Sequence, residues 1–95
     1  MPSLTYFDNR AEERAHELSD QPVTIGRIGE CAIRTHDASV SRRHATFLLR
    51  ADGWWVVDHG SDNGTWVNGR RVHSERKLED GDQVSCGRFS LRFHL

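Results

Sequence analysis

The sequence predicts a small all-β domain, and three observations lead to this prediction. Short runs rich in β-branched and aromatic residues recur along the chain, separated by Gly, Asn, Asp or Pro turn signals. No segment carries the apolar stripe of an amphipathic helix. Near the C-terminus, Phe89–Leu95 alternates apolar and polar residues, which is the period of a strand with one buried face. Many short strands at close spacing favour a β-sandwich or barrel.

The first part of the chain contains the less regular candidates. Leu4–Phe7 is β-prone, whereas Asn9–Leu18 combines good helix formers with almost no apolar stripe, so we expect a loop or a short polar hairpin there. Pro22 separates this segment from the next candidate strand, Val23–Gly26. A brief strand is expected at Ala32–Arg34.

The remainder alternates strands and turns more regularly. An Ala-Asp-Gly turn follows the apolar run after residue 44, and Asp80-Gly81-Asp82 marks another turn. Two Asn-Gly pairs, the strongest short turn signal, isolate a very short strand between them. The strands expected here are His44–Arg50, Trp54–Asp58, Thr65–Val67, Arg71–His73, one beginning at Leu78, Gln83–Cys86 and Phe89–Leu95.

Length and composition are those of one domain with a modest core. The chain has 95 residues, of which 36% are hydrophobic. No apolar run approaches the roughly 20 residues of a membrane span, and the acidic N-terminus does not fit a signal peptide. Cys31 and Cys86 are too few for a disulfide framework. We expect reduced, packed thiols in a cytoplasmic protein, with a single disulfide as the open alternative.

The charge distribution sets one segment apart. The net charge of −1 argues against a general nucleic-acid binder. Residues 21–50 nevertheless carry five basic and two acidic groups, and all five cations are arginines. A planar guanidinium can hold a phosphate or a carboxylate through two parallel hydrogen bonds. The segment is therefore either an anion-binding region or a mixed, solvated surface.

Three motifs follow one another along the chain: Gly26-Arg27 at the end of a predicted strand, Ser41-Arg42-Arg43-His44, and the Asn-Gly pairs within Gly60–Gly69. In this order they resemble the forkhead-associated (FHA) domain, a family of phosphothreonine-peptide readers. The resemblance covers residues 21–95 and is looser over residues 1–20, so we expect one FHA domain over residues 1–95. It implies a β-sandwich of about eleven short strands with the ligand site on loops at one end.

The resemblance implies that Arg27, Ser41 and Arg42 bind the phosphate. A phosphothreonine carries about −1.5 to −2 charges near neutral pH and offers three acceptor oxygens. Arginine side chains, a hydroxyl and its backbone N–H are suitable donors. The alternatives are an Arg27 that lies over the sandwich edge and a Ser41 hydroxyl that bonds its own turn. Arg43 is expected in solvent.

Three residues of the last motif are expected on the peptide side of the site. Asn63 can clamp a peptide backbone, because its amide has donors and an acceptor. Asn68 either contacts the peptide or braces its loop. Asp62 departs from the family, which commonly has a small hydroxyl residue there. Its carboxylate either repels the phosphate, pairs with Arg27 or Arg42, or holds the turn.

A further set is expected to shape the site without touching the ligand. Glycine permits backbone conformations that other residues disfavour. The resemblance implies that the histidine holds the phosphate loop through backbone hydrogen bonds, and no nucleophile is paired with it as in a catalytic site. These structural residues are Gly26, His44, Gly64 and Gly69.

Other functional classes lack their sequence signals. The chain has no G-x-S-x-G elbow and no Gly-rich phosphate loop leading into a helix, so we expect no enzyme activity. Its six histidines and two cysteines show no metal-ligand spacing, so we expect neither a metal nor a cofactor.

The expected function is recruitment of a protein that a Ser/Thr protein kinase has phosphorylated on threonine, by a domain of a larger protein. No nucleic acid and no membrane span are expected. The alternative is an FHA-like scaffold that binds a protein independently of phosphate. Asp62 favours this alternative, whereas Arg27 and Ser41 favour the phosphate reader. Binding of one peptide with and without its phosphate separates the two.

Overall fold

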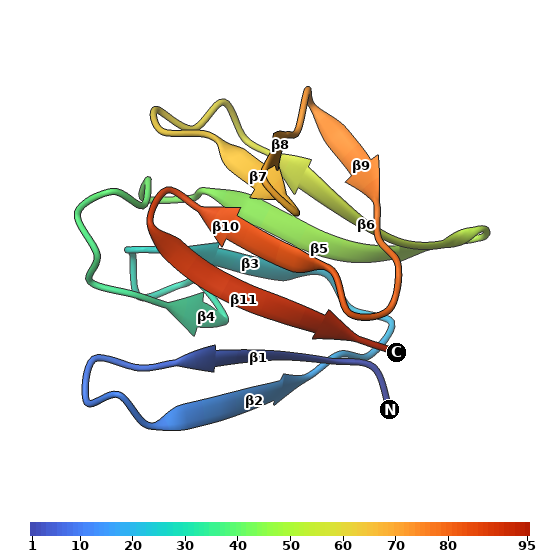
Figure 1. Cartoon of the computed structure of the whole chain (residues 1–95), viewed down its shortest axis with the longest axis horizontal. Coiled ribbons are helices and arrows are strands. Elements are labelled where there is room, and N and C mark those ends of the chain that lie inside the picture. Colours follow the sequence, from blue (N-terminus) through green and yellow to red (C-terminus); the bar gives the residue numbers. More distant parts are fainter.

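Two β-sheets packed face to face form the molecule, as the sequence predicts (Figure 1). The computed structural model describes residues 1–95, with eleven strands and no helix. The strands are β1 (Ser3–Phe7), β2 (Glu13–Glu17), β3 (Val23–Gly26), β4 (Ile33–Arg34), β5 (Ala45–Arg50), β6 (Gly53–Asp58), β7 (Thr65–Val67), β8 (Arg70–Arg71), β9 (Glu75–Lys77), β10 (Gln83–Cys86) and β11 (Phe89–His94). One sheet has the order β2-β1-β11-β10-β7-β8, and the other β4-β3-β5-β6-β9. Only β3 and β4 pair in parallel.

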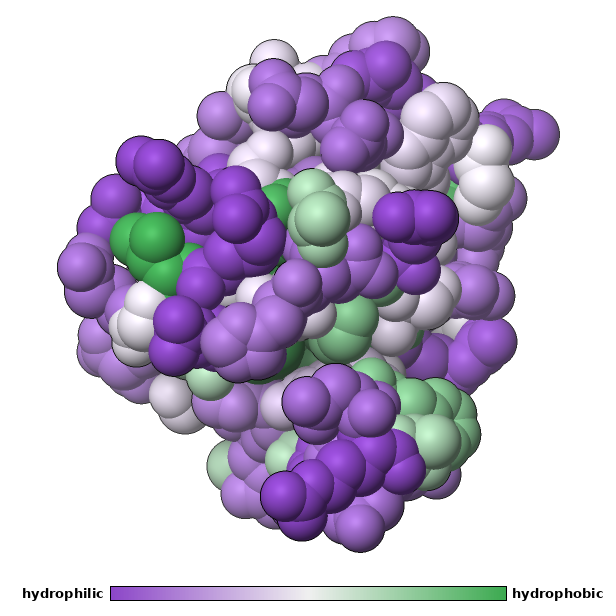
Figure 2. All heavy atoms as spheres, turned by 90° about the vertical axis from the view of Figure 1, so that its left-hand side faces the viewer, coloured by the Kyte–Doolittle hydropathy of each residue, from purple (hydrophilic) through white to green (hydrophobic).

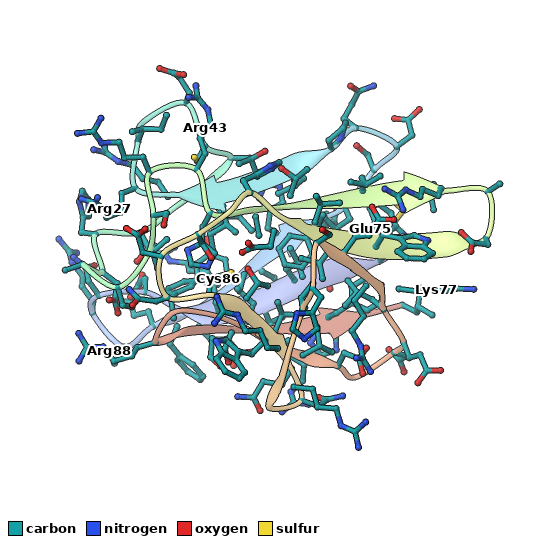
Figure 3. The ribbon with its side chains drawn as sticks, turned by 90° about the horizontal axis from the view of Figure 1, so that it is seen from above. Arg27, Arg43, Glu75, Lys77, Cys86 and Arg88 are labelled. Atoms are coloured by element: carbon teal, nitrogen blue, oxygen red, sulfur yellow. The ribbon has the colours of Figure 1, made fainter.

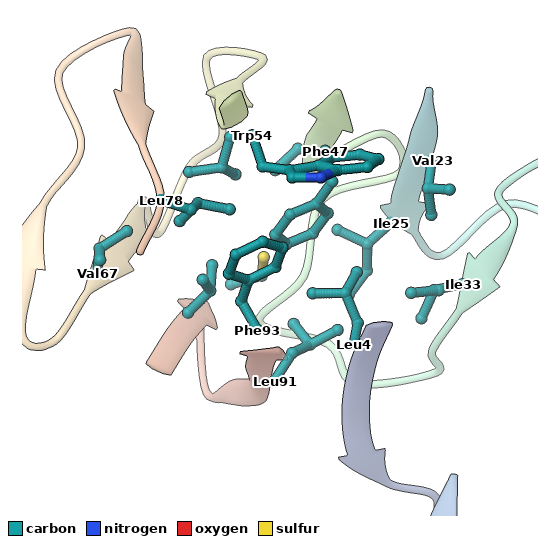
Figure 4. Packing of buried hydrophobic residues seen from close by; sticks show 14 of the residues in the cluster. Leu4, Val23, Ile25, Ile33, Phe47, Trp54, Val67, Leu78, Leu91 and Phe93 are labelled. Atoms are coloured by element: carbon teal, nitrogen blue, oxygen red, sulfur yellow. The ribbon is translucent and has the colours of Figure 1, made fainter. Parts of the chain in front are cut away.

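The alternating pattern of the strands buries one face of each sheet between the layers (Figure 4). In β11, Leu91 and Phe93 point into the core, whereas Ser90 and Arg92 face solvent. Phe47 and Phe93 have no exposed surface, and the Trp54 ring centroid lies 6.3 Å from that of Phe93. Each large apolar side chain buried in this way contributes about 1.5–3 kcal/mol to folding. This cluster fixes how the two sheets, and therefore their loops, face one another.

The N-terminal segment forms a hairpin, one of the two structures expected for Asn9–Leu18. The Asp8 carboxylate stabilises its turn by accepting hydrogen bonds from two backbone N–H groups, at 2.8 and 3.0 Å. Leu4 in β1 and Leu18 directly after β2 belong to the common core. The side chains of β2 itself are mostly exposed, which explains why the sequence shows no apolar stripe there.

The prediction of a strand beginning at Leu78 is wrong. The strand is β9, which precedes Leu78, and all three of its side chains are exposed. It is an edge strand that pairs with β6 through its backbone, so no apolar pattern marks it. Leu78 is buried after the strand, and its N–H donates to the Trp54 carbonyl at 2.8 Å. Similarly, the strand expected at Arg71–His73 is the exposed pair Arg70–Arg71.

The loops that carry the first two sequence motifs and the first Asn-Gly pair lie at one end of the sandwich, on the left in Figure 1, whereas Asn68-Gly69 lies in the β7–β8 turn at the other end of β7. The loops on the left are the β3–β4, β4–β5 and β6–β7 connections, and the β10–β11 turn lies beside them. Both termini lie at the opposite end, where Ser3 of β1 pairs with His94 of β11. Cys31 and Cys86 are buried free thiols and form no disulfide. None of the elements is a helix long and apolar enough to cross a membrane.

Candidate functional site

Gly26 ends β3 and lets the chain pass close to the β4–β5 loop. A β-carbon at this position would lie 2.0 Å from the Arg42 carbonyl oxygen and 2.9 Å from the Cys31 Sγ. This close approach allows the Arg27 N–H to donate to the same carbonyl at 2.9 Å. The end of β3 is thereby fastened to the β4–β5 loop, which supports the structural role predicted for Gly26.

Arg27 is exposed at the end of the molecule that carries the motifs (Figure 3). Its Nε donates to the Val40 carbonyl at 2.6 Å, so the β4–β5 loop fixes the base of the guanidinium. The two terminal nitrogens form no ion pair within the chain. An arginine held in this way presents two free NH₂ groups to an anion.

Ser41 lies between the Arg27 side and the β6–β7 loop. Its carbonyl accepts the Arg27 N–H at 3.3 Å, and its Oγ accepts the Asp62 N–H at 3.3 Å. The Ser41 N–H donates to the Nδ1 of His44 at 3.0 Å, so this group is not free for a ligand. The hydroxyl proton remains available, so the hydroxyl is the phosphate donor that Ser41 can offer.

His44 is fully buried beneath these loops. Because its Nδ1 accepts the Ser41 N–H, its proton lies on Nε2, which donates to the Gly64 carbonyl at 2.8 Å. Gly64 has a φ of 83°, and a β-carbon there would meet the Arg71 Nε at 3.0 Å. Both ring nitrogens of His44 therefore hold backbone, and neither faces a ligand.

Asn63 stands exposed at the tip of the β6–β7 loop. Its Nδ2 donates to the Ser39 carbonyl at 2.8 Å, which leaves Oδ1 and one N–H unused. The carbonyl of Asn63 accepts the Trp66 Nε1–H at 3.1 Å. A hollow of about 460 Å³ lies beside Asn63, and Ala38, Ser39, Asn63, Gly87 and Arg88 line it.

Asp62 is exposed and its carboxylate forms no ion pair. The pairing with Arg27 or Arg42, one of the three alternatives for Asp62, is therefore absent. The Asp62 side chain does not hold the turn either. The carboxylate of Asp58 accepts hydrogen bonds from the turn's backbone N–H groups instead. Asp62 contributes its N–H to Ser41 and leaves a free negative charge beside the site.

Asn68 lies at the end of β7 away from Gly64. Its Nδ2 donates to Asp82 at 2.9 Å, and its Oδ1 accepts the Gln83 N–H at 2.9 Å. This use of both ends of the amide favours the bracing role over peptide contact. Asn68 and Gly69 have φ values of 51° and 82°, as their turn requires, and a β-carbon on Gly69 would meet nothing.

The arginines at this end of the molecule differ in whether they form an ion pair. Arg42 is exposed without an ion pair, whereas Arg43 pairs with Glu30. Figure 3 places Arg88 at the same end as Arg27 and Arg43. Sequence reasoning missed Arg88, although the turn between two predicted strands was the signal that could have found it. The surface here is mostly hydrophilic (Figure 2).

The sequence analysis likewise did not single out Asp58 as a residue near the site. It is the last residue of β6 and lies at the base of the β6–β7 loop. Burial alone would raise the pKa of Asp58, but hydrogen bonds from Ser61, Thr65 and Gly60 more than offset it, so its pKa lies below the ordinary value. An Asp shortly before a Gly-Ser turn is a signal for such a side-chain bond.

Comparisons with known proteins place these features in a family. The FHA domain model matches residues 23–87. The oxoglutarate dehydrogenase inhibitor of Corynebacterium efficiens is 45% identical over 80 residues, which cover 83% of this chain and 56% of the relative. The glycogen accumulation regulator GarA of Mycolicibacterium smegmatis is 48% identical over 77 residues, which cover 80% of this chain and 48% of the relative. The chain thus spans about half the length of these relatives.

Solved structures give the same fold. The FHA domain of CT664 from Chlamydia trachomatis has a TM-score of 0.90 at 24% identity, covering 99% of this chain and 96% of that one. The FhaA FHA domain, complexed with the intracellular domain of Rv3910, has a TM-score of 0.86 at 30% identity, covering 99% and 100%. A domain from a study of phosphothreonine-dependent FHA interactions has a TM-score of 0.84 at 30% identity, covering 98% and 96%. The chain belongs to the FHA domain family.

Proposed function

We propose that the chain binds protein segments that carry a phosphothreonine, and so recruits partners of a Ser/Thr protein kinase pathway. One observation carries the proposal: three groups with unused donors are held along one connected set of loops. They are the terminal guanidinium nitrogens of Arg27, the Ser41 hydroxyl and the Asn63 amide. Ser41 connects the other two, since it bonds the backbone of Arg27 and of Asp62.

In this proposal the phosphate lies between Arg27, Ser41 and Arg42. Each charge-assisted hydrogen bond contributes roughly 1.5–3 kcal/mol, and ordering a flexible peptide offsets part of the sum. The balance corresponds to an affinity of about micromolar. The guanidinium of Arg27 is fixed at its base by Val40, so it loses less freedom on binding than a mobile arginine does.

Asn63 supplies the second half of the recognition. Its unused Oδ1 and N–H can accept from and donate to a peptide backbone, which fixes the peptide's position without reading its side chains. The hollow between Asn63 and Arg88 leaves room for the residues that flank the phosphothreonine.

The same proposal makes the chain a binding module without catalytic activity, within a larger protein. His44, the one histidine among the motifs, has both ring nitrogens engaged by backbone. The relatives are named an inhibitor and a regulator, and each is about twice as long as the matched segment.

A second function follows from Asp62. Its unpaired carboxylate lies next to Asn63 and opposes a bound phosphate. In this alternative the domain binds a protein partner through the same loops independently of phosphate.

Calorimetry with one peptide in two forms tests the proposal. The peptide is selected from a degenerate phosphothreonine library and compared with its unphosphorylated form. We expect about micromolar binding of the phosphorylated form and at least about tenfold weaker binding of the other. Equal binding of both forms would overturn phosphate dependence and favour the alternative.

A further inference from the structure

The carboxylate of Asp58 accepts hydrogen bonds from both ends of the β6–β7 loop. Its Oδ1 accepts the hydroxyls of Ser61 and Thr65 at 2.6 and 2.7 Å. Its Oδ2 accepts the N–H groups of Gly60 and Ser61 at 3.0 and 3.2 Å. Gly60 and Ser61 begin the loop, and Thr65 follows its end. Asp58 therefore joins the two ends of the loop to each other.

Only the ionised carboxylate satisfies this arrangement. All four partners donate, and an ionised carboxylate is the acidic side chain's acceptor-only form. A protonated acid or an amide at position 58 would bring a donor into this cluster, so at least one of the two hydroxyls would have to turn from donating to accepting. Asp58 forms no ion pair, so these hydrogen bonds alone compensate its partly buried charge.

The part of the loop between these anchors carries the contacts of the candidate site. The Asp62 N–H donates to the Ser41 Oγ, and the Asn63 amide donates to the Ser39 carbonyl. The Gly64 carbonyl accepts both the His44 Nε2–H and the Gly87 N–H, at 2.8 and 3.1 Å. A change in the path of the loop would therefore move the Asn63 amide and release the Ser41 hydroxyl.

We propose that Asp58 is a positioning residue of the ligand site, whose ionised carboxylate sets the loop path that presents Asn63 and Ser41 to the same ligand. This inference rests on the proposed function. Asp58 acts through Gly60, Ser61 and Thr65 and does not touch the peptide.

The matched control is another aspartate that holds a turn elsewhere. Asp82 is buried and accepts the Glu79 N–H at 2.8 Å and the Asn68 Nδ2–H at 2.9 Å. Its partners lie at the other ends of β7 and β10 from the candidate site. Asp58→Asn and Asp82→Asn both replace a hydrogen-bonding carboxylate by an amide of the same shape.

Two measurements on the whole chain test the inference. Both variants should lower the thermal midpoint, but only Asp58→Asn should weaken binding of the library-selected phosphothreonine peptide, by about tenfold or more. The second readout is the nuclear magnetic resonance signal of the Asn63 side-chain amide. In Asp58→Asn this signal should move toward that of a solvent-exposed asparagine, and in Asp82→Asn it should stay unchanged.

Other results of these measurements would overturn the inference or reject the proposed function. Folded Asp58→Asn with wild-type affinity and an unchanged Asn63 signal overturns the inference, as does equal loss of affinity in both variants. If Asp58→Asn does not fold, Ser61→Ala serves as the second variant, because it removes one hydroxyl donor to Asp58. We expect it to lose about threefold in peptide affinity and to shift the Asn63 amide signal in the same direction by a smaller amount. No change in Ser61→Ala overturns the inference. Failure of the wild type to bind the phosphopeptide rejects the proposed function instead, and the Asn63 signal then decides the role of Asp58.

Discussion

His44 and Gly64 join two loops that lie twenty residues apart, because the Nε2 of His44 donates to the Gly64 carbonyl at 2.8 Å. The other ring nitrogen accepts the Ser41 N–H at 3.0 Å. The ring has no exposed surface, so water cannot replace either bond. The phosphate side and the peptide side of the candidate site therefore depend on one imidazole.

His44→Ala should lower stability and binding together. The substitution leaves the Ser41 N–H without a partner, removes one of the two hydrogen bonds to the Gly64 carbonyl, and opens a cavity in a buried site. Each unsatisfied group costs about 1–3 kcal/mol, so the free energy of unfolding should fall by roughly 2–5 kcal/mol. Urea denaturation and calorimetry with the phosphothreonine peptide measure the two effects. Normal binding by a protein of unchanged stability would contradict the role given to His44.

Arg27→Ala should abolish binding and leave the fold intact. The side chain is exposed and contributes one hydrogen bond to Val40, so the free energy of unfolding should change by about 1 kcal/mol or less. Arg43→Ala is the matched control, because Arg43 lies at the same end but pairs with Glu30. The control should bind within about twofold of the wild type. Similar losses in both variants would indicate attraction by general charge rather than a specific contact.

Asp62→Thr should tighten binding of the phosphothreonine peptide. The change removes an unpaired negative charge and adds a hydroxyl donor next to the site. We expect a gain of roughly three- to thirtyfold, or about 0.7–2 kcal/mol, and a larger gain at low salt. The unphosphorylated peptide should not gain. Titrations of both peptides at two salt concentrations measure this, and an unchanged affinity at low salt would remove the repulsion argument.

Gly26→Ala should prevent stable folding. Its β-carbon would lie 2.0 Å from the Arg42 carbonyl oxygen, a backbone atom that cannot move without breaking the bond to Arg27. We expect a loss of more than about 4 kcal/mol in the free energy of unfolding. Gly29→Ala is the control in the same loop, since a β-carbon there meets only the Arg34 NH1, at 4.0 Å. Thermal unfolding of both proteins is the measurement. Comparable midpoints would show that the β4–β5 loop can move to accommodate the β-carbon, and would contradict the prediction.

Acid should destabilise the protein partly through Asp58. Its folded pKa lies below the unfolded value near 3.9, so the ionised form is favoured in the folded state. This contribution is fully present above that unfolded pKa and is lost as pH falls through the folded pKa. The contribution of Asp58 to the free energy of unfolding should be nearly constant from about pH 7 to 5 and should fall below about pH 4. Urea denaturation across this range should show a shallower fall in Asp58→Asn, and identical slopes would count against the prediction.

The features that the sequence predicts are those set by local conformation. The Asn-Gly pairs predict two tight turns, and Gly64, Asn68 and Gly69 have the positive φ values that such turns use. The alternation along Phe89–Leu95 predicts β11 because side chains of a strand point to opposite faces. These signals depend only on neighbouring residues.

The features that it misses depend on contacts between distant segments. β9 is recognisable only from its pairing with β6, because its own side chains are all exposed. Arg88 becomes a candidate only when the β10–β11 turn is placed beside Ser39, whose Oγ accepts the Arg88 N–H at 2.8 Å. The use of both Asn68 amide atoms likewise depends on the fold, which brings Asp82 and Gln83 to it.

The pairing of Ser3 with His94 has a consequence for how the domain can be attached to other molecules. It lies with both chain ends at the far end of the sandwich from the β3–β4, β4–β5 and β6–β7 loops. A biosensor surface or a fluorescent protein joined to either end therefore leaves the ligand loops facing outward. Intact phosphorylated proteins, and not only short peptides, can reach the loops of a domain that is immobilised in this way.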